Sequence, residues 1–373
     1  MKEFRINDYI SLKLEGGKTN LYVKGELFDQ CKFLLIDIPI ESDSSFEDID
    51  SIDKAAEQLD KSLEPHIEIN KQIRHNYQIP PDVEFWGHCS NLQVWYENCY
   101  DTRLLHRNMA FPLLKKLTEV GDPLALKVFK EEIILRYLKG IEAVKEYLYV
   151  EDYFSYLNSE EIISGILKPD EVNTLIELNL ISKKKYKFVR DFDEDKVRKE
   201  RFFLENLYFS SIDGFVTELE LNLNYFNFQV PEILSRLRSL FRLVIYSGSK
   251  SDRILRFKAV DSVKDLTLTL NGNVIIPDNF EKFKNLQSLS IYGSGDTKFE
   301  KIPSSLGQLS KLEELDIRNV PMEQFPYALT KLKSLEVLIL LQCSCTKIKE
   351  IPDIISEIPS LKSIKIEDIG EDD

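Results

Sequence analysis

The sequence predicts an α/β protein in which a right-handed repeat solenoid of about seven repeats, built on one parallel sheet, follows a mixed α+β N-terminal domain with a helical cap. Three observations predict this fold. A short apolar pattern recurs about every 23 residues through the second half of the chain, and a proline recurs between its copies. The first half shows strand-like alternation and then helix-like spacing. We expect these parts at 1–110 (mixed α+β), 111–204 (helical region and cap) and 205–373 (solenoid).

Composition excludes several classes of protein. The 373 residues are 43% hydrophobic and 30% charged, with 14 Gly and 14 Pro. Such a chain is too apolar to be disordered and too poor in Gly and Pro to be fibrous. Its net charge of −14 argues against binding nucleic acid or anionic membrane through the whole surface. We therefore expect neither of these partners.

The N-terminus and the cysteines predict a cytoplasmic protein. No apolar stretch near the start is long enough for a signal peptide. The longest apolar runs, Phe33–Ile36 and Val337–Leu341, are far shorter than the ~20 residues of a membrane span. The five cysteines are odd in number and scattered, which does not suggest a disulfide framework.

The repeat begins at Val216 and reads apolar, two residues, apolar, one residue, apolar. Its last two apolar positions alternate with period two, so each copy predicts a short strand with one buried face. A single copy cannot bury that face alone, whereas stacked copies share a continuous core. The central positions are Leu219, Leu243, Leu266, Leu289, Leu315, Leu338 and Ile364, at steps of 24, 23, 23, 26, 23 and 26 residues.

Prolines recur between the predicted strands, at a fixed position relative to the repeated leucines. Each follows an apolar or aromatic residue and precedes a run with helix-like spacing. Because proline suits the first turn of a helical segment, we expect short helices or 3₁₀ turns on the side of the solenoid away from the strands. The pairs are Val230-Pro231, Ile276-Pro277, Ile302-Pro303, Phe325-Pro326 and Ile351-Pro352.

These two signals together give residues 216–373 a resemblance to the short intracellular class of leucine-rich repeat, the 23-residue type found in Ras-group proteins. The resemblance implies a protein–protein interaction scaffold, with a signalling protein or a small GTPase among the candidate partners. Members usually place Asn or Cys three residues after the second strand leucine. Here that column reads Asn224, Gly248, Asn271, Ser294, Val320, Cys343 and Ile369. We therefore expect an incomplete ladder of buried side-chain hydrogen bonds, and a structural role for Cys343.

The second repeat departs from the pattern. It lacks its Ile-Pro pair and carries the basic segment Lys250–Lys258 instead, so we expect local irregularity there. The basic residues fit a solvated loop, and they also fit a contact with an acidic partner or a phosphate. They are Lys250, Arg253, Arg256 and Lys258, with Arg236, Arg238 and Arg242 nearby in the sequence.

The first half predicts a hairpin and then helices. Two alternating runs flank Gly16-Gly17, which is a hairpin signal. Cys31–Ile38 reads as a third strand and Ile52–Leu63 as helical. A helical hairpin is expected at Phe111–Glu119 and Leu124–Leu138. Further elements are expected at Ile141–Tyr149, Glu160–Leu167 and Asp170–Leu178 (helices), Lys183–Arg190 (strand) and Asp191–Phe203 (helix).

Candidate chemistry is concentrated in residues 85–106. His88, Cys89, Cys99 and His106 could supply zinc ligands, or a cysteine nucleophile with a histidine base, but the spacing is not that of a known site. Cys99-x-Asp101 is similar to the Cys-x-Asp motif of bacterial ubiquitin ligases with leucine-rich repeats, although there it follows the repeats. A packed cysteine is the simpler interpretation.

Two other motifs have plain structural interpretations. Gly16-Gly17-Lys18-Thr19 imitates the end of a phosphate-binding loop but has Leu12 where that motif needs its first glycine. Trp86 and Trp95 lie among other aromatic residues, which fits an aromatic core for the first domain better than a ligand cage.

The predicted binding face consists of the strand residues that alternate with the buried leucines and point onto the concave surface. Its two columns are mostly polar, but the sixth strand places three apolar side chains there. Tyrosine and arginine precede them, and both are favoured anchors of protein interfaces. We expect partner contacts at Tyr246, Tyr292, Asp316, Arg318, Val337, Ile339, Leu341 and Lys365.

The sequence therefore predicts a non-enzymatic scaffold that binds another protein and uses no metal or cofactor. The alternative is an enzyme with a Cys/His site in residues 85–106 and the repeats as its substrate receptor. The alternative to a partner at the apolar patch is that the chain's own tail or N-terminal half covers it.

Overall fold

The computed structural model describes residues 2–29, 79–190, 207–294, 296–301, 303–322, 325–343 and 358–367. The chain divides into two compact units, Met1–Tyr156 and Leu157–Asp373. The three predicted ranges remain a prediction, and the boundary between the units lies inside the second of them. The elements predicted at Cys31–Ile38, Ile52–Leu63 and Asp191–Phe203 lie outside the described residues. No helix in the described part is both long and apolar enough to span a membrane.

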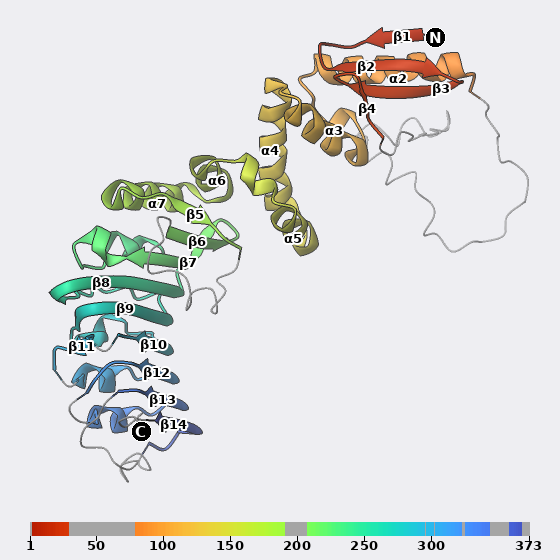
Figure 1. Cartoon of the computed structure of the whole chain (residues 1–373). Helices are drawn as coiled ribbons and strands as arrows, with labels where there is room; N and C mark the ends of the chain where they lie inside the picture. Colours follow the sequence, from red (N-terminus) through yellow and green to blue (C-terminus); the bar gives the residue numbers. More distant parts are fainter. Residues whose placement is uncertain are drawn as a thin grey trace, which may run out of the picture. The chain divides into compact units, whose positions relative to one another are not determined.

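The first unit begins with a four-stranded antiparallel sheet in the order β1-β2-β3-β4 (Figure 1). Gly16 and Gly17 join β2 to β3 with φ angles of +59° and +78°. Positive φ at both central residues is what a two-residue type I′ hairpin turn requires. The predicted hairpin is therefore confirmed, and the two glycines serve a turn. The strands are β1 Lys2–Arg5, β2 Ile10–Glu15, β3 Lys18–Val23 and β4 Glu26–Leu27.

Helices follow, and the predicted helical hairpin is α3 and α4. Asp122 begins α4 because its Oδ1 accepts hydrogen bonds from the backbone N–H groups of Leu124 (2.9 Å) and Ala125 (3.1 Å). The Tyr100 hydroxyl donates to the other oxygen of Asp122 at 2.6 Å and accepts from Asn7 at 2.8 Å. This network ties the first loop to the helices. The elements are α2 Pro81–Glu97, α3 Arg107–Glu119, α4 Pro123–Lys139, α5 Glu142–Val150 and the 3₁₀ helices Thr102–Leu104 and Tyr153–Tyr156.

The second unit is built on a ten-stranded, largely parallel sheet. Seven of its strands stack in parallel, one per repeat (Figure 1). Their register places each central leucine opposite the next, and Leu219 to Leu338 of this series are completely buried. This architecture fits a leucine-rich repeat and confirms the predicted strand ladder. The seven strands are β7 Phe215–Asn222, β8 Arg242–Ile254, β9 Asp265–Ile276, β10 Ser288–Tyr292, β12 Glu314–Arg318, β13 Val337–Leu341 and β14 Ser363–Glu367.

Short 3₁₀ helices connect the strands, as the prolines predict. Pro231, Pro303 and Pro326 each occupy the position just before a 3₁₀ helix. The fifth proline, Pro352, lies outside the described residues. The 3₁₀ helices are Leu223–Phe226, Glu232–Arg236, Phe280–Lys282, Ser304–Gln308 and Tyr327–Lys331.

Other elements precede the repeats in the same unit. Strand β5 pairs with β6 in parallel, and β6 pairs with β7 in an antiparallel ladder. Glu171 of α7 is buried and accepts a hydrogen bond from the backbone N–H of Val216 at 3.0 Å. Burial raises the pKa of this carboxyl group, and the bond from Val216 opposes that shift. The elements are α6 Ser159–Ile166, α7 Pro169–Ser182, β5 Tyr186–Phe188 and β6 Leu207–Ile212.

The irregularity predicted for the second repeat is confirmed. Instead of ending in a loop, β8 runs on into the basic segment as far as Ile254, and its register with β9 shifts between Ser249 and Arg253. The extended part of β9 also pairs with the short strand β11, Lys298–Phe299.

The ladder of side-chain hydrogen bonds three residues after the second strand leucine is incomplete, as expected. The Asn224 side chain donates to Gly248 O and accepts from Gly248 N. Ser294 accepts from Gly272 N, and the Cys343 thiol donates to Ile317 O at 3.4 Å. Gly248 and Val320 have no side-chain polar group to contribute. Cys343 is buried, which confirms its structural role.

Candidate binding surface

The strand register aligns the two predicted columns residue by residue. Ile339, for example, lies between Asp316 and Lys365, and Leu341 lies between Arg318 and Glu367. These side chains alternate with the buried leucines, so they belong to the opposite side of the sheet, which we call the outer face. The sequence thus predicts correctly which residues share this face.

The first part of the outer face is covered. Val244 is completely buried and Tyr246 is only 5% exposed. Val189 and Tyr208 pack against this pair. Glu220, Thr267 and Thr269 of the neighbouring strands are also buried. The expectation that Tyr246 is accessible to a partner is therefore wrong, because residues preceding the repeats pack onto the strand that carries it.

The outer face becomes accessible from β10 onward. Tyr292 and Arg318 are half-buried, and Lys365 is exposed. Asp316 is only 3% exposed, so the expectation that it contacts a partner directly is wrong, as it is for Tyr246. Together with the three apolar side chains of β13, they make one surface across four strands. We call this surface the β13 patch, and it consists of Tyr292, Asp316, Arg318, Val337, Ile339, Leu341 and Lys365.

A polar network fixes one side of the β13 patch. The Arg318 Nε donates to Asp316 Oδ1 at 2.8 Å, and the second guanidinium nitrogen donates to Asp316 Oδ2 at 2.8 Å. The Tyr292 hydroxyl donates to the same Oδ2 at 3.2 Å. The hydrogen bonds to Asp316 raise the pKa of Arg318. Such a two-point contact holds the guanidinium in one orientation and pairs its charge with the Asp316 carboxylate, so the patch has a preformed Arg–Asp edge.

The apolar part of the β13 patch is a single strand. Val337, Ile339 and Leu341 are all half-buried, whereas Leu338 and Leu340 between them are buried in the core. The patch thus combines a half-buried apolar row with fixed Arg and Tyr side chains. This composition is typical of the centre of a protein interface.

Comparison with known proteins gives little beyond the repeat. No family model matches the chain. No curated protein matches it either. The structure of a leucine-rich repeat protein of Leptospira interrogans is similar to part of the chain, with 20% sequence identity and a TM-score of 0.31. The similarity covers 40% of this chain and 36% of that protein.

The alternative Cys/His site of residues 85–106 is dispersed. Cys89 lies in the buried side of α2, and burial raises the pKa of its thiol to about 11. His88 lies beside Glu84 of the same helix, 3.5 Å apart. His106 begins α3, where its Nδ1 accepts from Asn108 N at 3.2 Å. No group of three or more His, Cys, Asp or Glu suited to a metal ion occurs in the described part of the chain, which includes His88, Cys89, Cys99 and His106.

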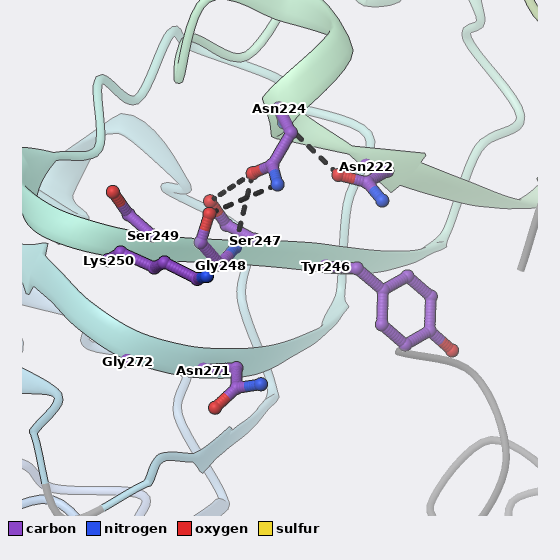
Figure 2. Close-up of a pocket in the computed structure, with 9 residues that line it drawn as sticks. All are labelled: Asn222, Asn224, Tyr246, Ser247, Gly248, Ser249, Lys250, Asn271 and Gly272. Carbon is purple, nitrogen blue, oxygen red and sulfur yellow. Dashed lines mark hydrogen bonds between the residues drawn. The ribbon is translucent and has the colours of Figure 1, made fainter. Parts of the chain in front are cut away.

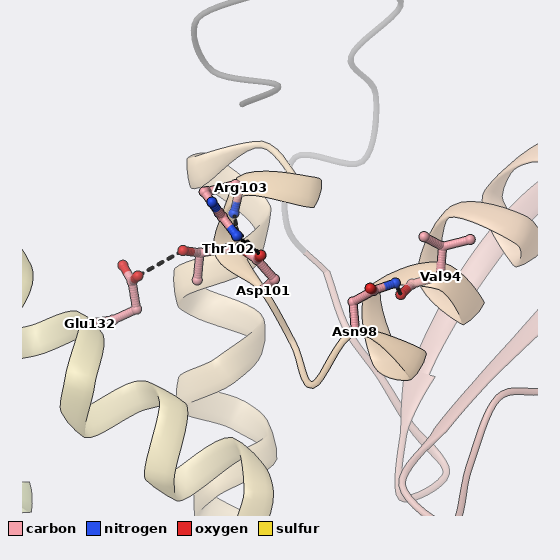
Figure 3. Close-up of polar contacts among 6 residues, drawn as sticks. All are labelled: Val94, Asn98, Asp101, Thr102, Arg103 and Glu132. Carbon is pink, nitrogen blue, oxygen red and sulfur yellow. Dashed lines mark hydrogen bonds and ion pairs between the residues drawn. The ribbon is translucent and has the colours of Figure 1, made fainter. Parts of the chain in front are cut away.

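The Cys99-x-Asp101 motif lies in the loop after α2. Cys99 is exposed and has a φ angle of +56°. Asp101 accepts from the Arg103 backbone N–H and from its guanidinium, and it begins a 3₁₀ helix (Figure 3). The Arg103 side chain holds the pKa of Asp101 below its usual value. Glu132 accepts from the Thr102 hydroxyl at 2.7 Å in the same region. Asp101 therefore has a structural role as a helix cap.

The aromatic residues of α2 form a core, as the simpler interpretation predicts. Phe85, Trp95 and Tyr100 are completely buried, and the rings of Trp95 and Tyr100 lie 4.6 Å apart. Trp86 is exposed and packs edge-on against Phe4.

The basic residues near the second repeat do not form one surface. Arg236 pairs with Glu177 at 2.9 Å. Arg253 lies over the ring of Phe228. Lys250 forms no ion pair with a carboxylate of the described residues and remains exposed.

Sequence reasoning named only Val337 from a third column of the outer face and missed its charged members. Arg242 lies between Glu218 (3.9 Å) and Asp265 (3.3 Å) on the two adjacent strands. The sequence did contain a signal for these pairs, because the same position of three successive repeats carries charges of alternating sign. These half-buried pairs hold the covered part of the face together.

Proposed function

We propose that the chain is a non-enzymatic scaffold that binds another protein through the β13 patch. The observation that carries the proposal is the row of three half-buried apolar side chains on β13, bordered by Arg318 and Tyr292. A strand whose outer side chains face water normally carries polar residues there. Burial of this apolar row by a partner would supply most of the binding free energy, and Lys365 would lie at the polar rim.

The absence of catalysis is part of the proposal. The nucleophile of the alternative enzyme would have to be a thiolate. Cys89 is buried with its pKa raised to about 11, so it is almost entirely a thiol at neutral pH. Asp101 and His106 are both engaged as helix caps. These arrangements support a structural role for residues 85–106.

The specific form of the proposal is an intracellular signalling role. It rests on the similarity of the repeat pattern to the Ras-group type, in which the repeats serve protein recognition. A small GTPase or another signalling protein is the class of partner that this pattern favours.

The test replaces the apolar row with charge. The double variant Ile339→Glu and Leu341→Glu should keep its circular dichroism spectrum, because both side chains are half-exposed at the surface. It should lose at least tenfold in affinity for a partner, because two carboxylates would be desolvated at the contact. Pull-down from a lysate of the source cells, with proteins identified by mass spectrometry, measures the loss, and light scattering measures self-association.

The matched control is Tyr327→Glu, an exposed residue of a 3₁₀ helix that is not on the outer face. The proposal expects the control to retain every association of the wild-type chain. If the double variant folds and retains the same proteins at full strength, the β13 patch is not the binding site.

A further inference from the structure

A pocket lies at the end of the outer face, where β7 ends and β8 and β9 continue (Figure 2). Its volume is about 300 Å³, which is large enough for a side chain or a small acid. It is separate from the β13 patch and shares no residue with it. The lining residues are Asn222, Asn224, Tyr246, Ser247, Gly248, Ser249, Lys250, Asn271 and Gly272.

Three side chains of the pocket have hydrogen-bond donors available. Lys250 has no ion-pair partner among the described residues, and its side chain runs back along β8 toward Gly248 (Figure 2). Asn222 uses its Oδ1 to accept from Asn224 N, which leaves its Nδ2 to donate. The Asn271 side chain is exposed and enters no hydrogen bond within the described part. None of the described residues that line the pocket is a carboxylate, although the chain as a whole carries a net charge of −14.

The walls of the pocket are fixed by the backbone. Asn224 is held against β8 because its side chain bonds to Gly248 N, Gly248 O and the Ser247 hydroxyl. Gly272 has a φ angle of +69°, and its backbone passes close to Ser249. Asn273 donates to Lys250 O at 3.0 Å and so anchors the lysine backbone. The donors therefore project from a rigid frame, which lowers the entropic cost of binding.

We infer that this pocket binds a carboxylate. One ammonium group matches the single negative charge of a carboxylate, and two carboxamides can donate to its remaining lone pairs. A phosphate carries about two charges and usually takes several cations or an Arg fork, and the neighbouring arginines are engaged elsewhere. The carboxylate belongs either to a small free acid or to an acidic side chain of a polypeptide. The inference does not rest on the proposed function, since the pocket would bind acetate even if the β13 patch were inert.

The test follows the side-chain amide signals of Asn222 and Asn271 by NMR in the full chain labelled with ¹⁵N-asparagine. Assignment uses Asn222→Ser and Asn271→Ser. The probes are acetate, its neutral counterpart acetamide, inorganic phosphate, and the capped peptides Gly-Glu-Gly and Gly-Gln-Gly. We expect saturable shifts of both signals with acetate and with the Glu peptide, and none with acetamide or the Gln peptide.

Two lysine variants decide whether the pocket is responsible. Lys250→Gln should weaken acetate binding about tenfold, as expected for loss of a charge-assisted hydrogen bond. Lys264→Gln makes the same charge change at an exposed lysine outside the pocket and should leave the affinity unchanged. Tighter binding of the Glu peptide than of acetate would assign the carboxylate to a polypeptide, and equal binding would assign it to a small acid.

Three results would overturn the inference. The first is the absence of saturable shifts with any carboxylate. The second is an equal loss of affinity in Lys250→Gln and Lys264→Gln, which would indicate general attraction to positive charge. The third is saturable binding of phosphate without binding of acetate or of the Glu peptide.

Discussion

Replacing Leu289 by aspartate should destabilise the repeat unit by about 5 kcal/mol, which corresponds to a fall in melting temperature of about 10–20 °C. Leu289 is completely buried and lies between Leu266 and Leu315 of the adjacent strands. The substitution removes a packed apolar side chain and places a carboxylate among leucines with no cation in the core to pair with it. Leu315→Asp should behave in the same way, since Leu315 occupies the equivalent position one repeat later.

The matched control for this substitution is Leu180→Asp. Leu180 belongs to α7 of the same unit but is 73% exposed, so the variant's melting temperature should change by no more than about 1–2 °C, or about 0.5 kcal/mol. Differential scanning calorimetry of the full chain measures all three variants. A melting temperature of Leu289→Asp equal to that of the wild type would contradict the assignment of these leucines to a continuous core.

Gly272→Ala should cost about 3 kcal/mol and lower the melting temperature by about 6–12 °C. Gly272 has a φ angle of +69°, in the region where a side chain is strained. A methyl group there would also lie 2.2 Å from the carbonyl oxygen of Ser249, and that atom is held in the backbone of the neighbouring strand. The clash cannot be relieved by a side-chain rotation, so the strands must separate.

The neighbouring glycine supplies the control. A methyl group on Gly248 would lie 3.5 Å from Asn271 O, which is an ordinary contact, and its φ angle is not in the left-handed region. Gly248→Ala should therefore change stability by less than about 1 kcal/mol. Equal melting temperatures for the two alanine variants would show that the close approach of β8 and β9 at Gly272 is not present in solution.

The repeat was predictable because one period recurs seven times. The phase of the leucines gives the strand register, and the register gives the outer face, so the alignment of Tyr292, Arg318 and Leu341 with their neighbours followed from the sequence alone. The prolines likewise gave the positions of three of the 3₁₀ helices. These features depend on local periodicity, which a sequence displays directly.

Accessibility was not predictable in the same way. Tyr246 occupies the expected column, yet Val189 and Tyr208 cover it. The cover is formed by residues that belong to no repeat, so the repeat period does not predict their packing. Long-range contacts of this kind depend on the tertiary fold.

The pocket could not be predicted from the sequence for a related reason. The segment from Lys250 read as a basic loop, whereas β8 continues through it as a strand with a register shift. This extension brings Lys250 beside Asn222 and Asn271 of the adjacent repeats. Three polar residues that are about 20–50 positions apart in the chain carry no joint sequence signal until the register is known.

The most direct test of the central claim is site-specific photo-crosslinking from the outer face. A benzophenone amino acid is placed at Ile339 in one sample and at Tyr327 in another, and both are irradiated in a lysate of the source cells. If the β13 patch binds a protein, position 339 will give a discrete adduct with another polypeptide chain, whereas position 327 will give none. Adducts of equal yield at both positions, or no intermolecular adduct at position 339, would contradict the claim that the β13 patch is a binding surface.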